Sequence, residues 1–254
     1  MKLFLGIPTG GAPAQPFLDS IGRLELPASI TAIERAIVTG NYVPAQRELI
    51  VRRAIEAGAD LLLMCDDDMI VPVNAVDALW NVLDRDPQCA LAGALYYSRD
   101  GFRPMAVDDW DPDNTTTAVI PAFDHDPVAV AGVGFGCVLV RVCALASLVP
   151  PYFSAQVYIE NEASRVRICN EDYLFCHRLR AAGFVVTLHG GVRCGHYDRW
   201  SGNIFPQHWE TPDETTRRRM AVLQNGERRL VPVGSAHPAN ERHERVEISY
   251  IWSG

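Results

Sequence analysis

The segment Leu61–Pro72 reads LLLMCDDDMIVP, in which five apolar residues are followed directly by three aspartates. An apolar run of this length fits a strand that is buried on both faces, as in a parallel sheet covered by helices. Three adjacent carboxylates repel one another, so the end of this strand requires a positive partner. Ligands of open α/β sheets bind beyond the carboxyl ends of the strands. The segment therefore predicts an α/β fold with a metal or phosphate site at this strand end.

Strand and helix patterns alternate through the first part of the chain, which is typical of the nucleotide-binding half of an α/β domain. In the first helical segment the apolar residues recur on one face, and Gly58 ends the segment in the manner of a helix C-cap. The expected elements are a strand at 2–8, a helix at 44–60, a strand at 60–65, a helix at 73–87 and a strand at 89–97.

The second part of the chain has a different character, and we find in it no repeat and no linker between independent domains. We therefore expect one domain over residues 1–210, with a mostly parallel sheet flanked by helices, and a polar, arginine-rich extension over 211–254. The expected elements after residue 97 are a loop-rich segment at 98–117, β-type runs at 117–123 and 127–142, a helix at 170–183, a strand at 184–200 that leads into a loop, and a late alternating run at 245–252.

The composition is ordinary for a soluble globular protein, with 48% hydrophobic and 21% charged residues. The seven cysteines form no C-x-x-C pair, which argues against a disulfide framework or a structural zinc site and favours a reducing, cytoplasmic compartment. We expect no transmembrane segment and no signal peptide, because no apolar run is long enough. The net charge of −8 argues against general attraction to nucleic acid, although basic clusters occur at Arg217–Arg219 and Arg228–Arg229.

The chain has 22 arginines but only one lysine, Lys2. Reactions that need carboxylates after a strand together with a lysine later in the chain are therefore excluded. A phosphatase of the haloacid dehalogenase type needs a lysine later in the chain, so it is excluded. A nucleotidyltransferase that makes sugar nucleotides has Arg and Lys in a glycine-rich loop after the first strand. The corresponding stretch here, IPTGGAPAQPF at Ile7–Phe17, has the glycines without the basic residues. Carboxylates on a compact turn instead suit Mg²⁺ or Mn²⁺ with a phosphate-bearing substrate.

A set of motifs occurs in a defined order over about residues 2–197. They are a Pro-Thr end to the first strand, a helix opening with QRE, GADLLLMCDDDM, AGALYY, GVGFGCVLVRV, NEDYLFCHRLRAAGF and CGHY. In this order they resemble the GT-A fold glycosyltransferases of the family-2-like group. The resemblance implies a single GT-A domain, with a nucleotide-sugar-binding half at 1–97 and an acceptor half at 98–210.

The resemblance also implies which residues hold a metal ion. Asp66 and Asp68 fall on the D-x-D, where Asp68 would ligate Mn²⁺ or Mg²⁺ and Asp66 would reach the metal or the donor ribose. Asp67 between them is expected to contact the donor as well. His196 falls where many such enzymes supply a third metal ligand. The cation would neutralise charge on the diphosphate leaving group.

The donor nucleotide is expected to lie against the first strand and the first helical segment. Pro8 and Thr9 end that strand, and Arg47 is a permanent cation able to meet phosphate or a base edge. A glycine-containing segment, Gly134, Phe135 and Gly136, would form the floor under the donor sugar or the acceptor, since glycine allows close backbone approach. Core packing at the start of a strand explains this segment equally well.

The acidic pair Glu171 and Asp172 opens a later helix, after Asn170. In the resembling family an acidic residue at this place takes the proton from the acceptor hydroxyl, and we expect Asp172 in that role with Glu171 beside it. Acidic residues in a first helical turn also complement the helix dipole, so a structural role remains an alternative.

The function implied by the resemblance is the transfer of a sugar from a nucleoside-diphosphate donor to an acceptor hydroxyl, with inversion as the expected outcome. The acceptor could be a glycan, a small molecule or a polyanion such as hydroxymethylated nucleic acid. Two alternatives stay open: a sugar-nucleotide nucleotidyltransferase, and a catalytically inactive domain that binds sugar nucleotides.

Overall fold

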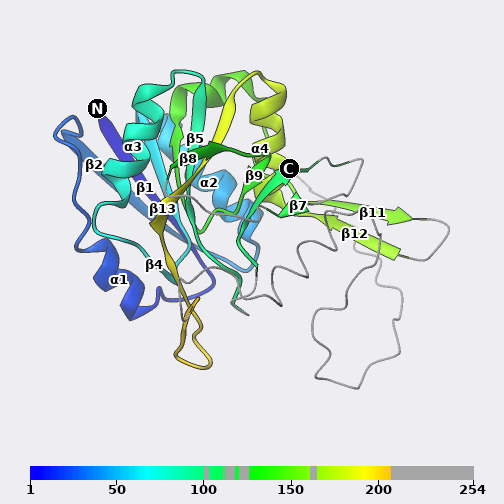
Figure 1. The fold of residues 1–254 in the computed structure, drawn as a ribbon, viewed down its shortest axis with the longest axis horizontal. Helices are drawn as coiled ribbons and strands as arrows, with labels where there is room; N and C mark the ends of the chain where they lie inside the picture. Colours follow the sequence, from blue (N-terminus) through cyan, green and yellow to red (C-terminus); the bar gives the residue numbers. More distant parts are fainter. Residues whose placement is uncertain (100–102, 111, 113–117, 120–125, 161–164, 207–254) are drawn as a thin grey trace.

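A seven-stranded sheet forms the centre of the computed structural model, which describes residues 1–99, 103–110, 112, 118–119, 126–160 and 165–206 (Figure 1). Five of its strands run parallel, whereas β10 is antiparallel to both of its neighbours and β8 is antiparallel at one edge. In spatial order the strands are β2 (Ala32–Thr39), β1 (Lys2–Thr9), β3 (Leu61–Cys65), β10 (Cys137–Arg141), β5 (Cys89–Leu95), β13 (Val185–Arg193) and β8 (Pro127–Ala129).

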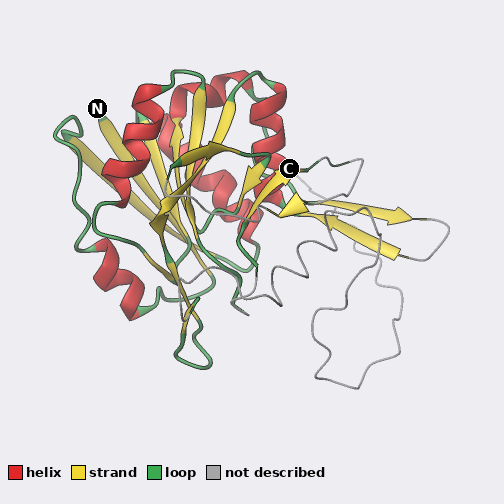
Figure 2. Cartoon of the chain, viewed as in Figure 1, coloured by secondary structure: helices red, strands yellow, loops and turns green. Residues whose placement is uncertain are grey.

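Helices cover both faces of this sheet (Figures 1 and 2). On one face lie α1 (Gln15–Ile21) and α3 (Ala75–Arg85), and on the other lie α2 (Val43–Glu56) and α4 (Glu171–Ala181). Strand β3 is buried on both sides, because Leu62 and Met64 pack toward α2 and α4 while Leu61, Leu63 and Cys65 pack toward α1 and α3. Each leucine buried in this way contributes roughly 1.5–3 kcal/mol. The expected mixed α/β architecture, with a mostly parallel sheet, is confirmed.

Three smaller sheets and one short helix complete the described chain. The sheet β15-β14-β4 matters most for the site, because it pairs His196 of β14 with Met69, directly after the three aspartates. The elements are β4 (Met69–Ile70), β14 (Gly195–Tyr197) and β15 (Ile204–Phe205); β6 (Ala106–Asp109), β7 (Ala118–Val119) and β9 (Gly132–Val133); the hairpin β11 (Gln156–Glu160) and β12 (Arg165–Cys169); and the 3-10 helix η1 (Val142–Ser147).

Most elements expected from the sequence are present with shifts of a few residues at their ends, but several elements were not expected. Strand β2, helix α1 and the β11–β12 hairpin had no counterpart in the sequence patterns. The expected strand at 184–200 is divided into β13 and β14, and the run at 127–142 into β8, β9 and β10. The extension at 211–254, with its late alternating run and its arginine clusters, lies outside the described residues. The division into a donor half and an acceptor half stays a prediction.

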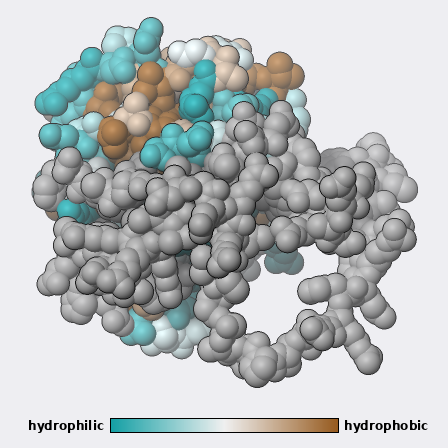
Figure 3. Space-filling model, turned by 45° about the vertical axis from the view of Figure 1, so that its right-hand side comes forward, coloured by the Kyte–Doolittle hydropathy of each residue, from teal (hydrophilic) through white to brown (hydrophobic). Residues whose placement is uncertain are grey.

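The surface of the described residues carries both polar and apolar side chains, which lie side by side in the coloured part of Figure 3. Exposed large apolar residues include Ile33 and Ile37 on the edge strand β2, and Trp200 is 97% exposed. Among the described residues, no helix is both long and apolar enough to cross a bilayer.

Candidate functional site

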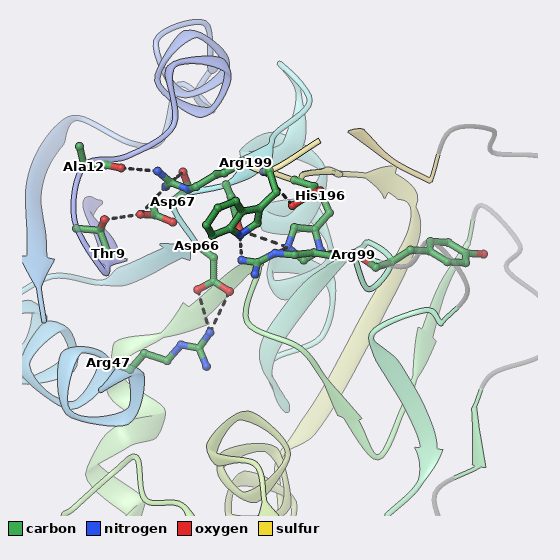
Figure 4. Close-up of polar contacts among 12 residues, drawn as sticks. Thr9, Ala12, Arg47, Asp66, Asp67, Arg99, His196 and Arg199 are labelled. Atoms are coloured by element: carbon green, nitrogen blue, oxygen red, sulfur yellow. Dashed lines mark hydrogen bonds and ion pairs between the residues drawn. The ribbon is translucent and has the colours of Figure 1, made fainter. Parts of the chain in front are cut away.

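The carboxyl ends of β1, β3 and β5 meet at one edge of the sheet, and the polar residues singled out from the sequence gather there. Thr9 ends β1, the aspartates follow β3, and Arg99 lies just beyond β5. The start of α4 and the strand β14 complete this edge. The site therefore combines side chains from both ends of the described chain, as Figure 4 shows.

The three aspartates do not face one another, because each forms an ion pair with a different arginine. Arg47 pairs with Asp66, Arg199 with Asp67 and Arg99 with Asp68. Backbone hydrogen bonds fix the turn: Asp66 N donates to Gly136 O at 3.0 Å, and Tyr197 N donates to Asp68 O at 2.8 Å. The repulsion expected within the DDD stretch is thus relieved by three separate guanidinium groups, two of which, Arg99 and Arg199, the sequence analysis did not identify.

Asp67 is directed toward the end of β1. The Thr9 hydroxyl donates a hydrogen bond to Asp67 Oδ2, and Arg199 Nη2 lies 2.8 Å from the same oxygen. Arg199 also donates to Ala12 O at 2.7 Å, so it ties the loop after β14 to the loop after β1. Thr9 is buried, and Gln46 of α2 donates to its carbonyl at 2.6 Å. Pro8 is buried in β1, next to Thr9.

Asp68 and His196 form the part of the site best suited to a metal ion. His196 Nε2 lies 3.5 Å from Asp68 Oδ2, while His196 Nδ1 donates to Tyr97 O at 2.8 Å. A backbone hydrogen bond on the far ring nitrogen is the usual way in which a metal-binding histidine is oriented. Arg99 bonds both side chains, since it donates to Asp68 Oδ2 and, at 3.2 Å, to His196 Nε2. A guanidinium therefore lies where a cation would bind.

The electrostatics of Asp68 agree with a cation site. Burial would raise the pKa of Asp68, but its contacts with His196 and Arg99 outweigh the effect of burial and hold the pKa below its ordinary value. Within the described residues, no three His, Cys, Asp or Glu side chains come together as a ready metal cluster. Two protein ligands nevertheless suit Mg²⁺ or Mn²⁺, because these ions commonly complete their shell with substrate phosphate and water. Asp68 and His196 fit such an ion.

Asp66 belongs to a different cluster, on the α2 side of the site. Arg47 Nη2 donates to both of its carboxylate oxygens, at 2.9 and 3.1 Å, and Arg47 Nη1 donates to Glu171 Oε1 at 2.5 Å. Burial raises the pKa of Asp66 above its ordinary value, although Arg47 acts in the opposite direction. Arg47 is 4% exposed, and its guanidinium carbon lies 5.3 Å from the centre of the Phe135 ring.

Asp172 lies beside this cluster at the start of α4. Its Oδ1 accepts a hydrogen bond from Tyr173 N at 2.9 Å, and the side chain of the preceding Asn170 makes no capping bond. Burial, partly offset by Arg47, raises the pKa of Asp172 to about 6. Across the described residues Asp172 has no ion-pair partner within 4 Å, unlike Glu171. Asp172 is therefore a carboxylate that can take a proton near neutral pH.

The Gly134–Gly136 segment supports the site from beneath. Phe135 is fully buried among Phe153 and Phe175, with ring centroids 5.3 and 5.4 Å away. A Cβ atom added at Gly136 would lie 2.8 Å from Met69 Sδ and from the Tyr96 ring, so one of these buried side chains would have to shift to admit it. The backbone of this segment therefore approaches the aspartate turn closely. Direct contact of the segment with a sugar stays a prediction.

The sheet order, the helices on both faces and the position of the site at the carboxyl strand ends define a GT-A-like fold. No protein-family model and no curated protein sequence matches the chain. Solved structures do resemble it, two of which are A197 from STIV and GalNAc-T7. A197 from STIV superposes with a TM-score of 0.57 and 16% identity, over 83% of this chain and 96% of its own. GalNAc-T7, solved with UDP, GalNAc and Mn²⁺, superposes with a TM-score of 0.51 and 12% identity, over 88% of this chain but only 48% of its own.

Proposed function

We propose that the protein is a metal-dependent glycosyltransferase that moves a sugar from a nucleoside-diphosphate donor to an acceptor hydroxyl. The observation that carries the proposal is that the aspartate turn, His196 and the acidic start of α4 converge at the carboxyl ends of the sheet strands in a GT-A-like fold. The order of motifs along the chain favours the family-2-like group. The Mn²⁺ and UDP bound to the similar GalNAc-T7 structure support the choice of cofactor and donor class.

In this proposal some residues hold the metal ion, others bind the donor nucleotide, and one acts as the general base. Asp68 and His196 would hold Mn²⁺ or Mg²⁺, which when bound supplies positive charge to the departing diphosphate. Thr9, Asp67 and the adjoining Pro8 would lie along the donor nucleotide. Pro8 and Thr9 lie at the end of β1, and the Thr9 hydroxyl bonds Asp67 of the aspartate turn.

Asp172 is the general base in this proposal. A hydroxyl is a poor nucleophile until its proton has an acceptor, and a carboxylate within hydrogen-bond reach provides one. With a pKa of about 6, Asp172 is mainly ionised at neutral pH and can still hold the proton transiently. Direct attack by the acceptor on the donor sugar would invert the anomeric carbon. The acceptor would be a glycan, a small molecule or a polyanion such as hydroxymethylated nucleic acid, in a cytoplasmic setting.

A thermal-shift experiment tests the donor and metal assignments together. A ligand that binds only the native state raises the unfolding free energy by about 2.7 kcal/mol at a hundred times its Kd. We therefore expect UDP- or GDP-sugars to raise the melting temperature, and Mn²⁺ to enlarge this rise. Asp68→Ala should remove the metal-dependent part, whereas the control Asp77→Ala, at an exposed position of α3, should retain it.

The assignment fails if Asp68→Ala keeps the full metal-dependent shift. The products distinguish the alternatives. Release of pyrophosphate from a nucleoside triphosphate and a sugar 1-phosphate would indicate a nucleotidyltransferase. Binding of sugar nucleotides without any turnover would indicate an inactive binding domain.

A further inference from the structure

Arg47 has an unusual position for an arginine, because its guanidinium is enclosed between two functional carboxylates. It lies on α2 and is 4% exposed, and its two partners come from other elements. Asp66 follows β3, and Glu171 opens α4, which is 124 residues away from Arg47 in the sequence. The two ion pairs, at 2.9 and 2.5 Å, connect the donor side of the site to the acceptor side.

The two ion pairs with Asp66 and Glu171 require the planar guanidinium group of an arginine. One terminal nitrogen of Arg47 meets both oxygens of Asp66, and the other terminal nitrogen meets Glu171. The ring of Phe135 lies against the guanidinium, and the buried Nε has no hydrogen-bond partner among the described residues. A lysine has one compact ammonium group and cannot reproduce two such directed contacts.

The charges of this cluster determine which carboxylate is available for proton transfer. Glu171 is held by Arg47, whereas in the described chain no cationic side chain lies within ion-pair distance of Asp172. The ion pair of Glu171 with Arg47 thereby anchors the start of α4. Because Asp172 is the next residue, it is held in place beside the cluster. Any displacement of Arg47 would change the orientation of Asp66 and of the first turn of α4 together.

We propose that Arg47 is a positioning residue that fixes Asp66 and Glu171 relative to each other, so that the donor carboxylate and the acceptor base act as one unit. This inference rests on the proposed glycosyltransferase function and adds a division of roles within the acidic pair. Glu171 anchors the helix start, and Asp172 receives the proton. In this arrangement Arg47 acts through its two carboxylate partners, and a nucleotide contact would require it to leave one of them.

The experiment compares Arg47→Lys, Glu171→Gln and the double variant with wild type. The control is Arg52→Lys, about one turn further along α2. Arg52 is exposed, and its one ion pair within the described part of the chain is with Glu48 of the same helix. Turnover is measured as UDP release from a UDP-sugar that stabilises the wild type, with Mn²⁺ and with water as acceptor. The fraction of folded protein and the urea unfolding midpoint are measured in parallel.

We expect each single variant to lower kcat by about 10²-fold per folded molecule, because small misplacements of catalytic groups have effects of this size. The double variant should lose no more than either single variant, since both break the same connection. Arg52→Lys should leave kcat unchanged.

Three outcomes would overturn the inference. The first is an unchanged kcat with only a lower unfolding midpoint, which indicates a purely structural ion pair. The second is a double variant whose losses multiply, which indicates independent roles. The third is an increase of donor KM alone in Arg47→Lys, which indicates a nucleotide contact. If wild type neither binds nor cleaves any nucleotide sugar, the proposed function fails, and the inference fails with it. A non-additive urea midpoint would then show that the ion-pair connection exists without that function.

Discussion

Burial determines the chemistry of the carboxylate at the start of α4. Asp172 has a pKa of about 6 because its side chain is buried, and Arg47 offsets only part of that effect. A base of this kind works when it is ionised, so the rate should fall about tenfold per pH unit below pH 6. Asp172→Asn should preserve the shape and donor binding but lower the transfer rate by about 10²–10⁴-fold. Steady-state kinetics between pH 5 and 8 measure both effects.

The neighbouring residue provides the contrast for this prediction. Glu171→Gln should lower the rate through misplacement of the helix start, without removing the acidic limb of the pH profile. Full transfer activity in Asp172→Asn would show that Asp172 is not the base.

Arg99 and a metal ion compete for the same pair of side chains. The guanidinium of Arg99 bonds Asp68 and His196, and its own side chain is 60% exposed. Exposed ion pairs contribute up to about 1 kcal/mol, so Arg99→Ala should raise the affinity for Mn²⁺ alone by about two- to fivefold. His196→Ala should lower that affinity, because it removes one of the two proposed protein ligands. Titration calorimetry with Mn²⁺ measures these changes. Equal affinities in wild type, Arg99→Ala and His196→Ala would contradict the assignment of Asp68 and His196 as metal ligands.

At the level of elements, the sequence predicted what depends on local pattern. The apolar run of β3 and the periodic apolar face of α2 are signals contained within a single segment, and the structure has both elements. Strand β2 lacked such a signal, because its residues are mostly exposed and charged residues interrupt its apolar positions. It is a strand because its full length pairs with β1, which is a tertiary contact.

The distinction between signals within one segment and tertiary contacts also applies to the candidate site. Asp66, Asp68, His196 and Asp172 could be found from the order of motifs. The pairing of Asp67 with Arg199 could not, because 132 residues separate these positions and β14 must first pair with β4. Arg99 was missed for a similar reason, since the loop after β5 shows no pattern that points to Asp68.

The close contact between the Gly136 backbone and the aspartate turn leads to a prediction about stability. A methyl group at this position would lie 2.8 Å from Met69 Sδ and from the Tyr96 ring, in the fully buried layer beneath the site. Gly136→Ala should therefore lower the unfolding free energy by about 1–3 kcal/mol, as expected for overpacking. Gly11→Ala is the control, because nothing lies within 4 Å of an added Cβ there. Urea denaturation measures both, and equal stability of the two variants would rule out the close contact.

At the scale of the whole molecule, the site is assembled at a cost to the stability of the fold. Strands β1 and β3 and helices α2 and α4 bring buried carboxylates together at one edge, with Arg47 as the cation between two of them. Burial raises the pKa of both Asp66 and Asp172, which means that their ionised forms are destabilised in the native state. A divalent cation would offset part of this excess negative charge, so metal binding and stability are coupled.

This cost makes stability depend on pH in a defined direction. An unfolded aspartate releases its proton near pH 3.9, whereas native Asp172 retains it up to about pH 6. Between these values the native state binds more protons, so the contribution of Asp172 to the unfolding free energy decreases as the pH rises. At about 1.4 kcal/mol per pKa unit, the decrease reaches roughly 2–3 kcal/mol by pH 8. Asparagine has no such proton and can still accept the hydrogen bond from Tyr173 N.

Asp172→Asn should therefore be more stable than wild type at pH 8 by roughly 2–3 kcal/mol, and the difference should shrink toward zero near pH 4. The opposite sign is expected if Asp172 only complements the helix dipole, because removal of such a carboxylate lowers stability by about 0.3–1 kcal/mol. Urea unfolding of both proteins at pH 4, 6 and 8 distinguishes the two. Glu171→Gln should lower stability at pH 8, since it leaves Arg47 buried with one partner fewer. A variant that gains stability while losing turnover would identify Asp172 as a residue whose burial serves the reaction and not the fold.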